Sequence, residues 1–284
     1  MLKTPALATL QTKFCCLRGA GIISFFDPGS HSVFERIALL IVLSMAGASC
    51  SEPMRDIEIP FQVTWGGEPM SCDDAGLALT DLRFYASNLE LLTADGDVHV
   101  LQQLALIDLE NGQGACQNGT TEVKQKVSGS VPVADYEGLR FTLGVPFDLN
   151  HADPLAAQPP LDDPAMHWHW RSGYKFLRAG VRSENDGFWI HVGSAGCQGT
   201  VGNITDCRFP NRVAVELDEF DVGKQSVAID LEALFKGINL ADGERSDCSS
   251  GPPEDTCIAP FRALGIDFAA GERVDAQQVF SAAP

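Results

Sequence analysis

The sequence predicts an all-β protein, an antiparallel β-sandwich with long loops and disulfides, on three observations. Short segments that alternate apolar and polar residues recur along the chain, as in strands with one buried face. Glycine- and aspartate-rich turns separate these segments, and helical periodicity is confined to short pieces. Nine cysteines in 284 residues favour an exported, cross-linked protein over a reduced cytosolic one.

The predicted elements follow from this alternation and from turn residues. Pro60 is typical of an edge strand, and the turn at 94–97 joins two segments into a hairpin. Asn185-Asp186-Gly187 is a second hairpin turn, residues 230–236 have a short helical pattern, and the proline-rich segment 150–165 is expected to be a functional loop. Eight segments are predicted as strands: 57–65, 82–92, 98–107, 139–143, 174–182, 188–192, 212–217 and 226–230.

Residues 1–49 are predicted to be a leader that ends in a lipoprotein signal peptide. The apolar run 37–48 is too short to span a bilayer and is typical of a signal sequence. It ends in Ala48-Ser49 before Cys50, so Cys50 is the predicted lipidated first residue of the mature chain; an ordinary secretory signal is the alternative. Because a long stretch precedes the run, we expect translation to start near Val33.

This leader sets the expected domains and location. Residues 50–56 are expected to be a lipidated linker and 57–284 a single domain. Either kind of signal exports the chain, so we expect it in the periplasm or at the cell surface, anchored to the outer membrane through its lipid.

Composition and the absence of motifs exclude several function classes. A formal charge of −18 and a pI near 4.6 argue against a nucleic-acid partner, which requires basic surface. The sequence contains no Gly-x-Ser-x-Gly, no His-Glu-x-x-His, no phosphate-binding glycine loop and no Cys-x-x-Cys-His. We therefore expect a binding protein and not an enzyme.

The remaining cysteines of the mature chain are expected to form three disulfides. Their even number in an exported chain favours this pattern, and without a Cys-x-x-Cys a thiolate zinc site is disfavoured. Proximity suggests Cys197–Cys207 and Cys248–Cys257, which leaves Cys72–Cys116, although six cysteines allow fifteen pairings. The six residues are Cys72, Cys116, Cys197, Cys207, Cys248 and Cys257.

The segment Met166-His167-Trp168-His169-Trp170 is the strongest candidate for chemistry. In a strand, His167 and His169 project to one face and Trp168 and Trp170 to the other. Imidazole nitrogens suit copper and zinc, and the Met166 thioether would favour Cu(I). The same pattern also fits an aromatic core, or tryptophans that stack on a glycan or a partner protein.

Further ligands for a metal site must come from elsewhere in the chain. His191 lies on the next predicted hairpin, and His151 lies just before the proline-rich loop. Each histidine taken alone could equally be a hydrogen-bonded structural residue, so the ligand set stays open at this stage.

Five segments also resemble a known family, the MbnP proteins, also called metallo-mystery pair four-Cys proteins. The resemblance runs from about residue 57 to 270 and is carried by 80–89, 136–147, 150–154, 166–177 and 191–197. It implies an exported copper-binding β-sandwich whose partner is a di-haem protein like cytochrome c peroxidase. It also implies that copper, Cu(I) or Cu(II), is held by histidines and by a kynurenine made by oxidising a tryptophan.

Carried onto this sequence, the resemblance makes Trp168 or Trp170 the oxidised residue. The implied ligands come from His167, His169, His191 and His151, and Cys248–Cys257 is an addition to the four cysteines of the family. Two alternatives remain: a non-metal exported module that binds a glycan or protein through 166–170, and a redox protein that uses the metal. No cysteine lies among these ligands, which argues against a blue-copper centre.

Overall fold

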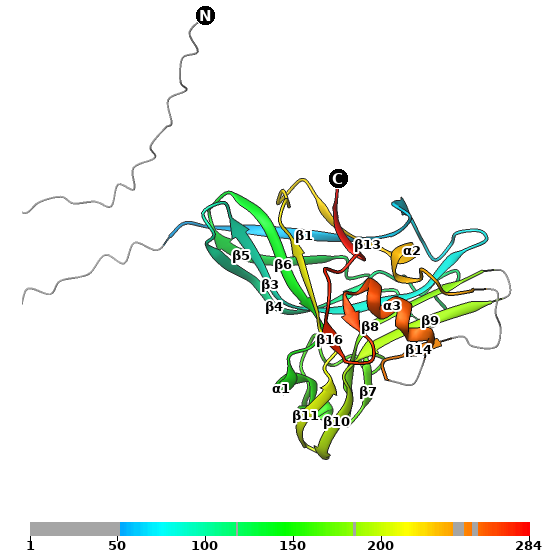
Figure 1. The fold of residues 1–284 in the computed structure, drawn as a ribbon. Coiled ribbons are helices and arrows are strands. Elements are labelled where there is room, and N and C mark those ends of the chain that lie inside the picture. The colour runs from blue at the N-terminus through cyan, green and yellow to red at the C-terminus, as the bar shows by residue number, and fades with distance from the viewer. Residues whose placement is uncertain (1–51, 118, 184–185, 241–246, 252–254) are drawn as a thin grey trace, which may run out of the picture. The chain divides into compact units, whose positions relative to one another are not determined.

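The computed structural model confirms the all-β prediction. It describes residues 52–117, 119–183, 186–240, 247–251 and 255–284, so the predictions for the leader, for a start near Val33 and for lipidation at Cys50 lie outside it. Residues 50–284 form one compact unit, in which two large sheets pack face to face (Figure 1). In the part of the chain that is described, no helix is long and apolar enough to cross a bilayer.

The first sheet is built around the N-terminal strand. Its order is β17-β13-β1-β2, with β5 also pairing β1. The β1–β13 pair is parallel and the others are antiparallel. Pro60 was predicted to mark an edge strand. It lies instead at the residue where β1 changes partner from β5 to β13, so its missing N–H disrupts no ladder. The strands are β1 (Met54–Trp65), β2 (Glu68–Pro69), β5 (Lys126–Pro132), β13 (Ser226–Asp230) and β17 (Phe280–Ala283).

The second sheet is centred on the long strand β3. Its order is β12-β6-β3-β8-β9-β14, while β4 also pairs β3 and β7 pairs β8. All its pairs are antiparallel except β14–β9. The strands are β3 (Ala78–Thr93), β4 (Val98–Asp108), β6 (Tyr136–Leu143), β7 (His167–His169), β8 (Gly173–Arg182), β9 (Gly187–Gly193), β12 (Val213–Leu217) and β14 (Asp247–Ser249).

The main core lies between these two sheets. Phe61 of the first sheet packs edge-on against Phe84 and Phe141 of the second, with ring centroids 5.8 and 6.1 Å apart. Phe280 closes the cluster from the C-terminal strand, at 5.6 Å from Phe84 and 5.5 Å from Phe141. Each such edge-to-face pair stabilises by about 0.5–1.5 kcal/mol beyond the area that it buries.

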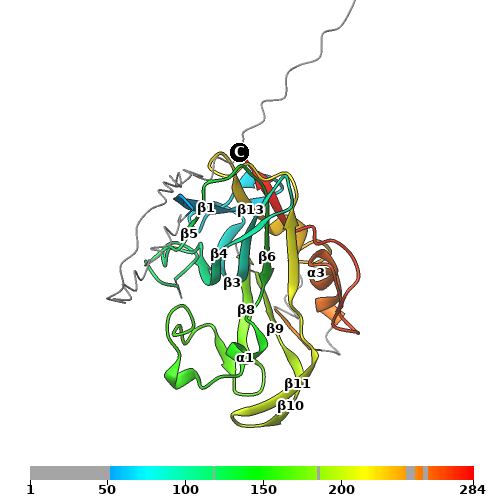
Figure 2. The same cartoon turned by 90° about the vertical axis from the view of Figure 1, so that its left-hand side faces the viewer.

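Short elements connect and extend the sheets. Asp230 caps α2 by accepting a hydrogen bond from the Glu232 amide, at the site of the predicted short helix. The β10–β11 hairpin pairs only with itself among the described strands, and it lies with α1 and β7 at one end of the sandwich (Figures 1 and 2). These elements are α1 (Phe147–Asn150), η1 (Pro154–Ala156), α2 (Leu231–Leu234), η2 (Asp255–Cys257), α3 (Ile258–Ala263), β10 (Ala195–Thr200), β11 (Asn203–Phe209), β15 (Ile266–Asp267) and β16 (Glu272–Arg273).

The three disulfides form as proximity suggested. They join Cys72–Cys116, Cys197–Cys207 and Cys248–Cys257. The first and third belong to the main core, whereas Cys197–Cys207 links β10 to β11 in a small separate cluster. The six cysteines are therefore cross-links, as predicted.

Candidate metal centre

Residues His167–His169 of the His-Trp segment form the short strand β7, and one asparagine fixes the return of the chain into β8. His167 pairs with Tyr174, and His169 pairs with Gly173. The buried Asn150 side chain accepts a hydrogen bond from the Tyr174 amide at 2.8 Å and donates one to the Ser172 carbonyl at 2.9 Å. Gly173 has a φ of +78°, and a Cβ there would lie 2.2 Å from the Asn150 carbonyl oxygen, so only glycine fits.

Basic side chains of β8 hold the segment that precedes β7. Lys175 Nζ and Arg178 Nη1 both donate to the carbonyl oxygen of Ala165, at 3.0 and 3.1 Å. Arg83 Nη1 lies 3.6 Å from the Asp163 carboxylate. Three cations from two neighbouring strands therefore fix residues 163–165 against the outer face of the second sheet.

These cations belong to a buried network of charges. Arg83 is 1% exposed and donates to Asp81 at 3.1 and 3.2 Å, while Asp81 also pairs with Arg178. Glu110, fully buried, lies 3.9 Å from Arg83 Nε. Burial raises the pKa of Asp108 to about 7, and the Glu110 charge adds to this effect while Arg83 opposes it.

Trp168 and His191 form the central contact of the site. Their rings meet edge-on with centroids 6.2 Å apart. A Cβ on Gly193 would lie 3.2 Å from Trp168 Cε3, so the indole packs directly against this glycine of β9. Ser250 Oγ fixes β9 here, because it accepts from the Gly193 amide and donates to the His191 carbonyl, both at 2.7 Å.

The surroundings of His191 keep its imidazole neutral. Burial, together with the nearby cations Arg178 and Lys175, lowers its pKa to about 4 against the opposite effects of Asp81 and Asp247. A neutral imidazole has a free nitrogen lone pair, which is the form that binds a metal ion.

The other two histidines of the segment differ in environment. The His167 ring meets Tyr174 edge-on at 5.3 Å, and burial, followed by the Lys175 and His169 charges, lowers its pKa. His169 is exposed and its ring lies 5.5 Å from that of Trp170. The pairing of β7 with β8 shifts register between the two histidines, so the predicted common face of His167 and His169 stays a prediction.

His151 and Trp170 both lie against the Cys197–Cys207 disulfide. His151 Nε2 lies 3.4 Å from Cys207 Sγ, and its ring meets Phe147 at 4.8 Å. Trp170 packs on the disulfide cluster, with the Arg171 guanidinium over its ring at 4.9 Å. Burial, and after it the Arg212 charge, lowers the pKa of His151.

The geometry partly fits the copper ion that the sequence implies. Two half-buried imidazoles with lowered pKa, His191 and His167, are suitable nitrogen donors, and Trp168 lies against the first of them. Within the described ranges, however, no three ring nitrogens of the four predicted histidines lie within 4.8 Å of one another. The full ligand set stays a prediction, and a nitrogen donor made from Trp168 would add to His191.

Sequence reasoning did not find the charged network behind the site. Its one signal is that Asp81, Arg83 and Arg178 are charged residues inside or next to otherwise apolar predicted strands. It also did not place His151 beside a disulfide, because that contact depends on how α1 packs against the β10–β11 hairpin.

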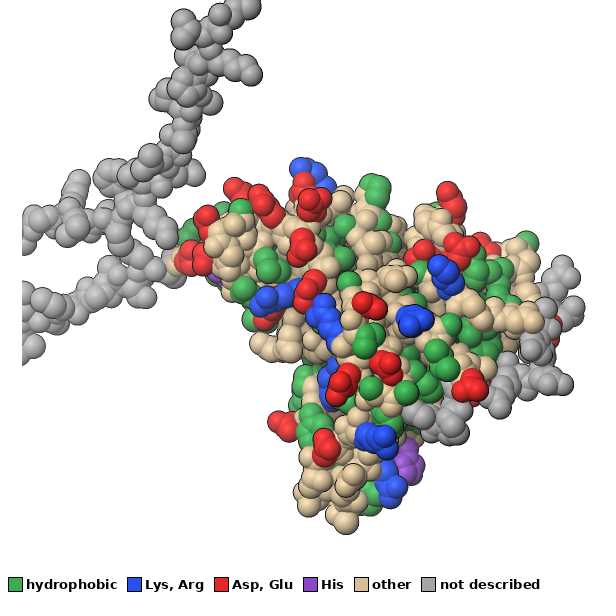
Figure 3. Space-filling view, viewed as in Figure 1, with side chains coloured by type: hydrophobic (Ala, Val, Ile, Leu, Met, Phe, Trp, Pro, Cys, Tyr) green, Lys and Arg blue, Asp and Glu red, His purple; other side chains and the backbone are tan. Residues whose placement is uncertain are grey.

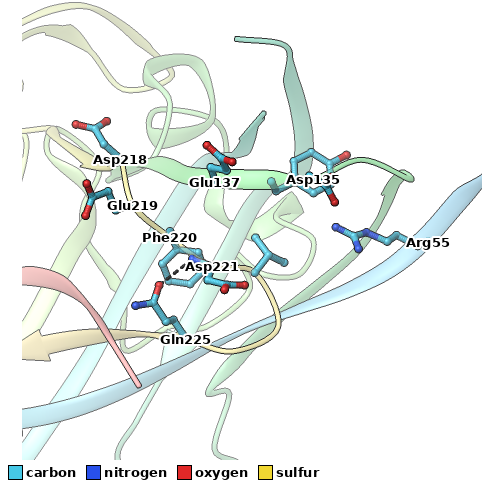
Figure 4. A pocket seen from close by; sticks show the side chains of 10 residues that line it. Arg55, Asp135, Glu137, Asp218, Glu219, Phe220, Asp221 and Gln225 are labelled. Carbon is cyan, nitrogen blue, oxygen red and sulfur yellow. Dashed lines mark hydrogen bonds between the residues drawn. The ribbon is translucent and has the colours of Figure 1, made fainter. Parts of the chain in front are cut away.

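A second concave feature lies away from these residues. A cavity of about 520 Å³ is formed by the start of β1, the turn before β6 and the connection from β12 to β13 (Figure 4). Its carboxylates are Asp135, Glu137, Asp218, Glu219 and Asp221. Acidic side chains are also spread over the face shown in Figure 3, as the negative charge predicts. The cavity lining contains no imidazole or thiol, so it offers no donor of the kind that copper prefers.

Comparison with known proteins gives two matches. The family model described as MbnP matches residues 54–250. Among solved structures, MbnP from Methylosinus trichosporium superimposes with a TM-score of 0.70 at 25% sequence identity, covering 81% of this chain and 98% of that one. No curated protein matches.

Proposed function

The chain belongs to the MbnP family, and from this premise we propose that it is an exported copper-binding protein whose Trp168 is oxidised to kynurenine. The observation that carries the proposal is the edge contact between Trp168 and His191, at 6.2 Å between centroids. It places an oxidisable ring beside an imidazole held neutral by burial, whereas Trp170 contacts the exposed His169.

Oxidation would change what Trp168 can bind. An indole N–H is a donor only, so tryptophan offers copper no nitrogen lone pair. Opening the five-membered ring adds two oxygen atoms, and hydrolysis then releases formate and leaves an aromatic amine. That amine supplies a lone pair, and copper bound there would be held by nitrogen donors from kynurenine and His191. His167, which precedes Trp168 in the chain and whose pKa burial also lowers, is the candidate for a further ligand.

The packing favours Trp168 over Trp170 as the modified residue. Trp168 lies against Gly193 and the half-buried His191, whereas Trp170 lies against the Cys197–Cys207 disulfide, under Arg171 and beside the exposed His169. Each of the six cysteines is in a disulfide and the chain carries no redox cofactor motif, so the oxidising equivalents must come from a partner. We propose a di-haem, cytochrome c peroxidase-like protein in this role, with the present chain as its substrate and not itself an enzyme.

The proposal includes a location. Cys50 would carry a lipid that holds the domain at the outer membrane, in the periplasm or at the cell surface. Strand β1 begins at Met54, so only a few residues would separate the lipid from the folded domain.

Mass spectrometry of the protein purified from its own host, with metal analysis, tests this function. We expect the peptide that contains residues 166–170 to gain two oxygen atoms and lose one carbonyl group at Trp168, with copper near one ion per chain. Trp168→Phe should lose both the modification and the copper, whereas the matched Trp170→Phe should keep both. Unmodified tryptophans without copper, in cells that make the di-haem partner, would contradict the proposal, and modification of Trp170 would contradict the assignment to Trp168.

A further inference from the structure

His151 and the Cys197–Cys207 disulfide bring three metal-binding atoms together outside the Trp168–His191 contact. His151 Nε2 and the two sulfur atoms all lie within 4.8 Å of one another. Metal–sulfur bonds of about 2.3 Å and metal–nitrogen bonds of about 2.0 Å in a trigonal plane place donor atoms roughly 3.7–4.0 Å apart. Only small side-chain rotations would therefore be needed to enclose an ion once the S–S bond is open.

The hydrogen bonds of Asn150 show which nitrogen of the His151 imidazole carries the lone pair. Asn150 Oδ1 accepts from the Tyr174 amide and Nδ2 donates to the Ser172 carbonyl, which fixes which end of the amide is the donor. The same Nδ2 lies 3.2 Å from His151 Nε2, so Nε2 is the acceptor nitrogen and carries the lone pair. Nε2 also lies 3.4 Å from Cys207 Sγ, so a metal ion bound there would replace the hydrogen bond from Asn150.

This disulfide is also the most accessible of the three. Cys197 and Cys207 are 6% and 7% exposed, whereas Cys116, Cys248 and Cys257 are fully buried and Cys72 is 3% exposed. The β10–β11 hairpin that it closes pairs with no other described strand, and its tip is exposed, with Val201 at 74%. Local opening at this hairpin leaves both large sheets intact, so a thiol reductant can reach these sulfurs first.

We propose that reduction of Cys197–Cys207 by a dithiol creates a second metal site, in which the two thiolates and His151 bind one Cu(I) ion. The dithiol supplies two electrons and two protons, the S–S bond opens to two thiols, and the reductant leaves as its own disulfide. Binding of Cu(I) then releases the two thiol protons to water. Thiolates are soft ligands that select Cu(I), and Phe147 and Trp170 cover the site with apolar surface.

The hairpin keeps the donors adjacent after reduction. Cys197 and Cys207 are directly opposite each other in the antiparallel register, so backbone hydrogen bonds hold them together without the covalent link. His151 is fixed by its neighbour Asn150, which is anchored to the turn before β8. The site thus uses residues separate from the Trp168–His191 contact and from its maturation.

The test compares the full-length protein before and after mild anaerobic reduction with dithiothreitol. Iodoacetamide labelling followed by mass spectrometry should modify Cys197 and Cys207 and leave the other four disulfide cysteines unlabelled. Cu(I) titrated from a chromophoric chelator should bind in one equivalent more to the reduced protein than to the oxidised protein, and it should protect both thiols from labelling.

Variants identify the ligands. Cys197→Ser should abolish the additional binding, and His151→Ala should weaken it by at least about tenfold, the loss that even an outer-shell partner of a metal ligand causes. His99→Ala is the matched control, because His99 lies on β4 against Tyr136 and should change nothing. No additional Cu(I) on reduction, equal binding by His151→Ala, or earlier labelling of Cys72 and Cys116 would each overturn the proposal. Circular dichroism of oxidised His151→Ala checks that the variant is folded.

Discussion

Replacement of Arg83 by methionine should destabilise the folded protein by about 3–5 kcal/mol, the usual cost of removing one partner from a buried ion pair. Arg83 is 1% exposed and serves three carboxylates, Asp81, Glu110 and Asp163. After the change Asp81 keeps Arg178, and Glu110 keeps the amides of Gly112 and Thr120. Most of the cost therefore comes from negative charge left without its central cation.

The pH dependence of this loss is a sharper test than its size. Burial raises the pKa of Asp108 to about 7, so the folded state holds a proton that the unfolded chain has released, and stability falls as pH rises from about 4 toward 7. Arg83 lowers this pKa, so its removal raises the pKa of Asp108 further. The pH range over which stability falls therefore extends to higher pH. Each further unit by which the pKa of folded Asp108 rises costs about 1.4 kcal/mol of stability at pH values above that pKa. The difference between Arg83→Met and wild type should thus be larger at pH 8 than at pH 5.

Urea denaturation followed by tryptophan fluorescence measures both effects. Arg140→Met is the matched control, because Arg140 pairs with Glu90 but is 43% exposed, and such pairs contribute only about 0.2–1 kcal/mol. If Arg83→Met lost no more stability than Arg140→Met, or if its loss did not change with pH, the central role of Arg83 in the network would be refuted.

Three other outcomes are expected. His191→Gln should gain stability relative to wild type as pH falls from about 6.5 to about 4, since the wild-type folded state excludes a proton there; parallel urea midpoints at pH 7 and pH 5 would contradict this. Paired serine substitutions should cost about 4 kcal/mol at Cys72–Cys116 and about 2.7 kcal/mol at Cys197–Cys207, from loop separations of 44 and 10 residues, in thermal denaturation; equal losses would contradict the loop-entropy reasoning. Asn150→Ala should lose about 1–3 kcal/mol by leaving the Tyr174 amide unpaired, and a smaller loss in urea would show that water replaces the side chain.

Strand alternation predicted most of the two large sheets but not the segments that lack it. The predicted strand 82–92 lies within β3, and 174–182 and 188–192 match β8 and β9 within a residue. β5 was not predicted because Val127 and Val131 are its only buried residues, and its place is set by pairing with β1. The parallel β1–β13 pair could not be predicted either, because it joins residues more than 160 positions apart.

For the site, the sequence indicated which residues matter but not how they group. His167 and His169 do lie on one short strand, β7, but its pairing with β8 shifts register between them, which alternation alone could not predict. The contact between Trp168 and His191 depends on the register of β8 with β9 and on the missing side chain of Gly193. The position of His151 depends on a four-residue helix without a side-chain cap, for which the sequence carries no periodic signal.

The pairing of β1 with β13 has a consequence for the order in which the chain can fold. Synthesis delivers β1 early, but its parallel partner is Val227–Asp230, and β13 in turn needs Phe280–Ala283 at the C-terminus. The first sheet therefore cannot close until almost the whole polypeptide has emerged. Long-range pairing of this kind folds slowly and leaves the apolar face of β1 open in the meantime. Removal of the last few residues should accordingly damage the N-terminal strand, at the opposite end of the sequence.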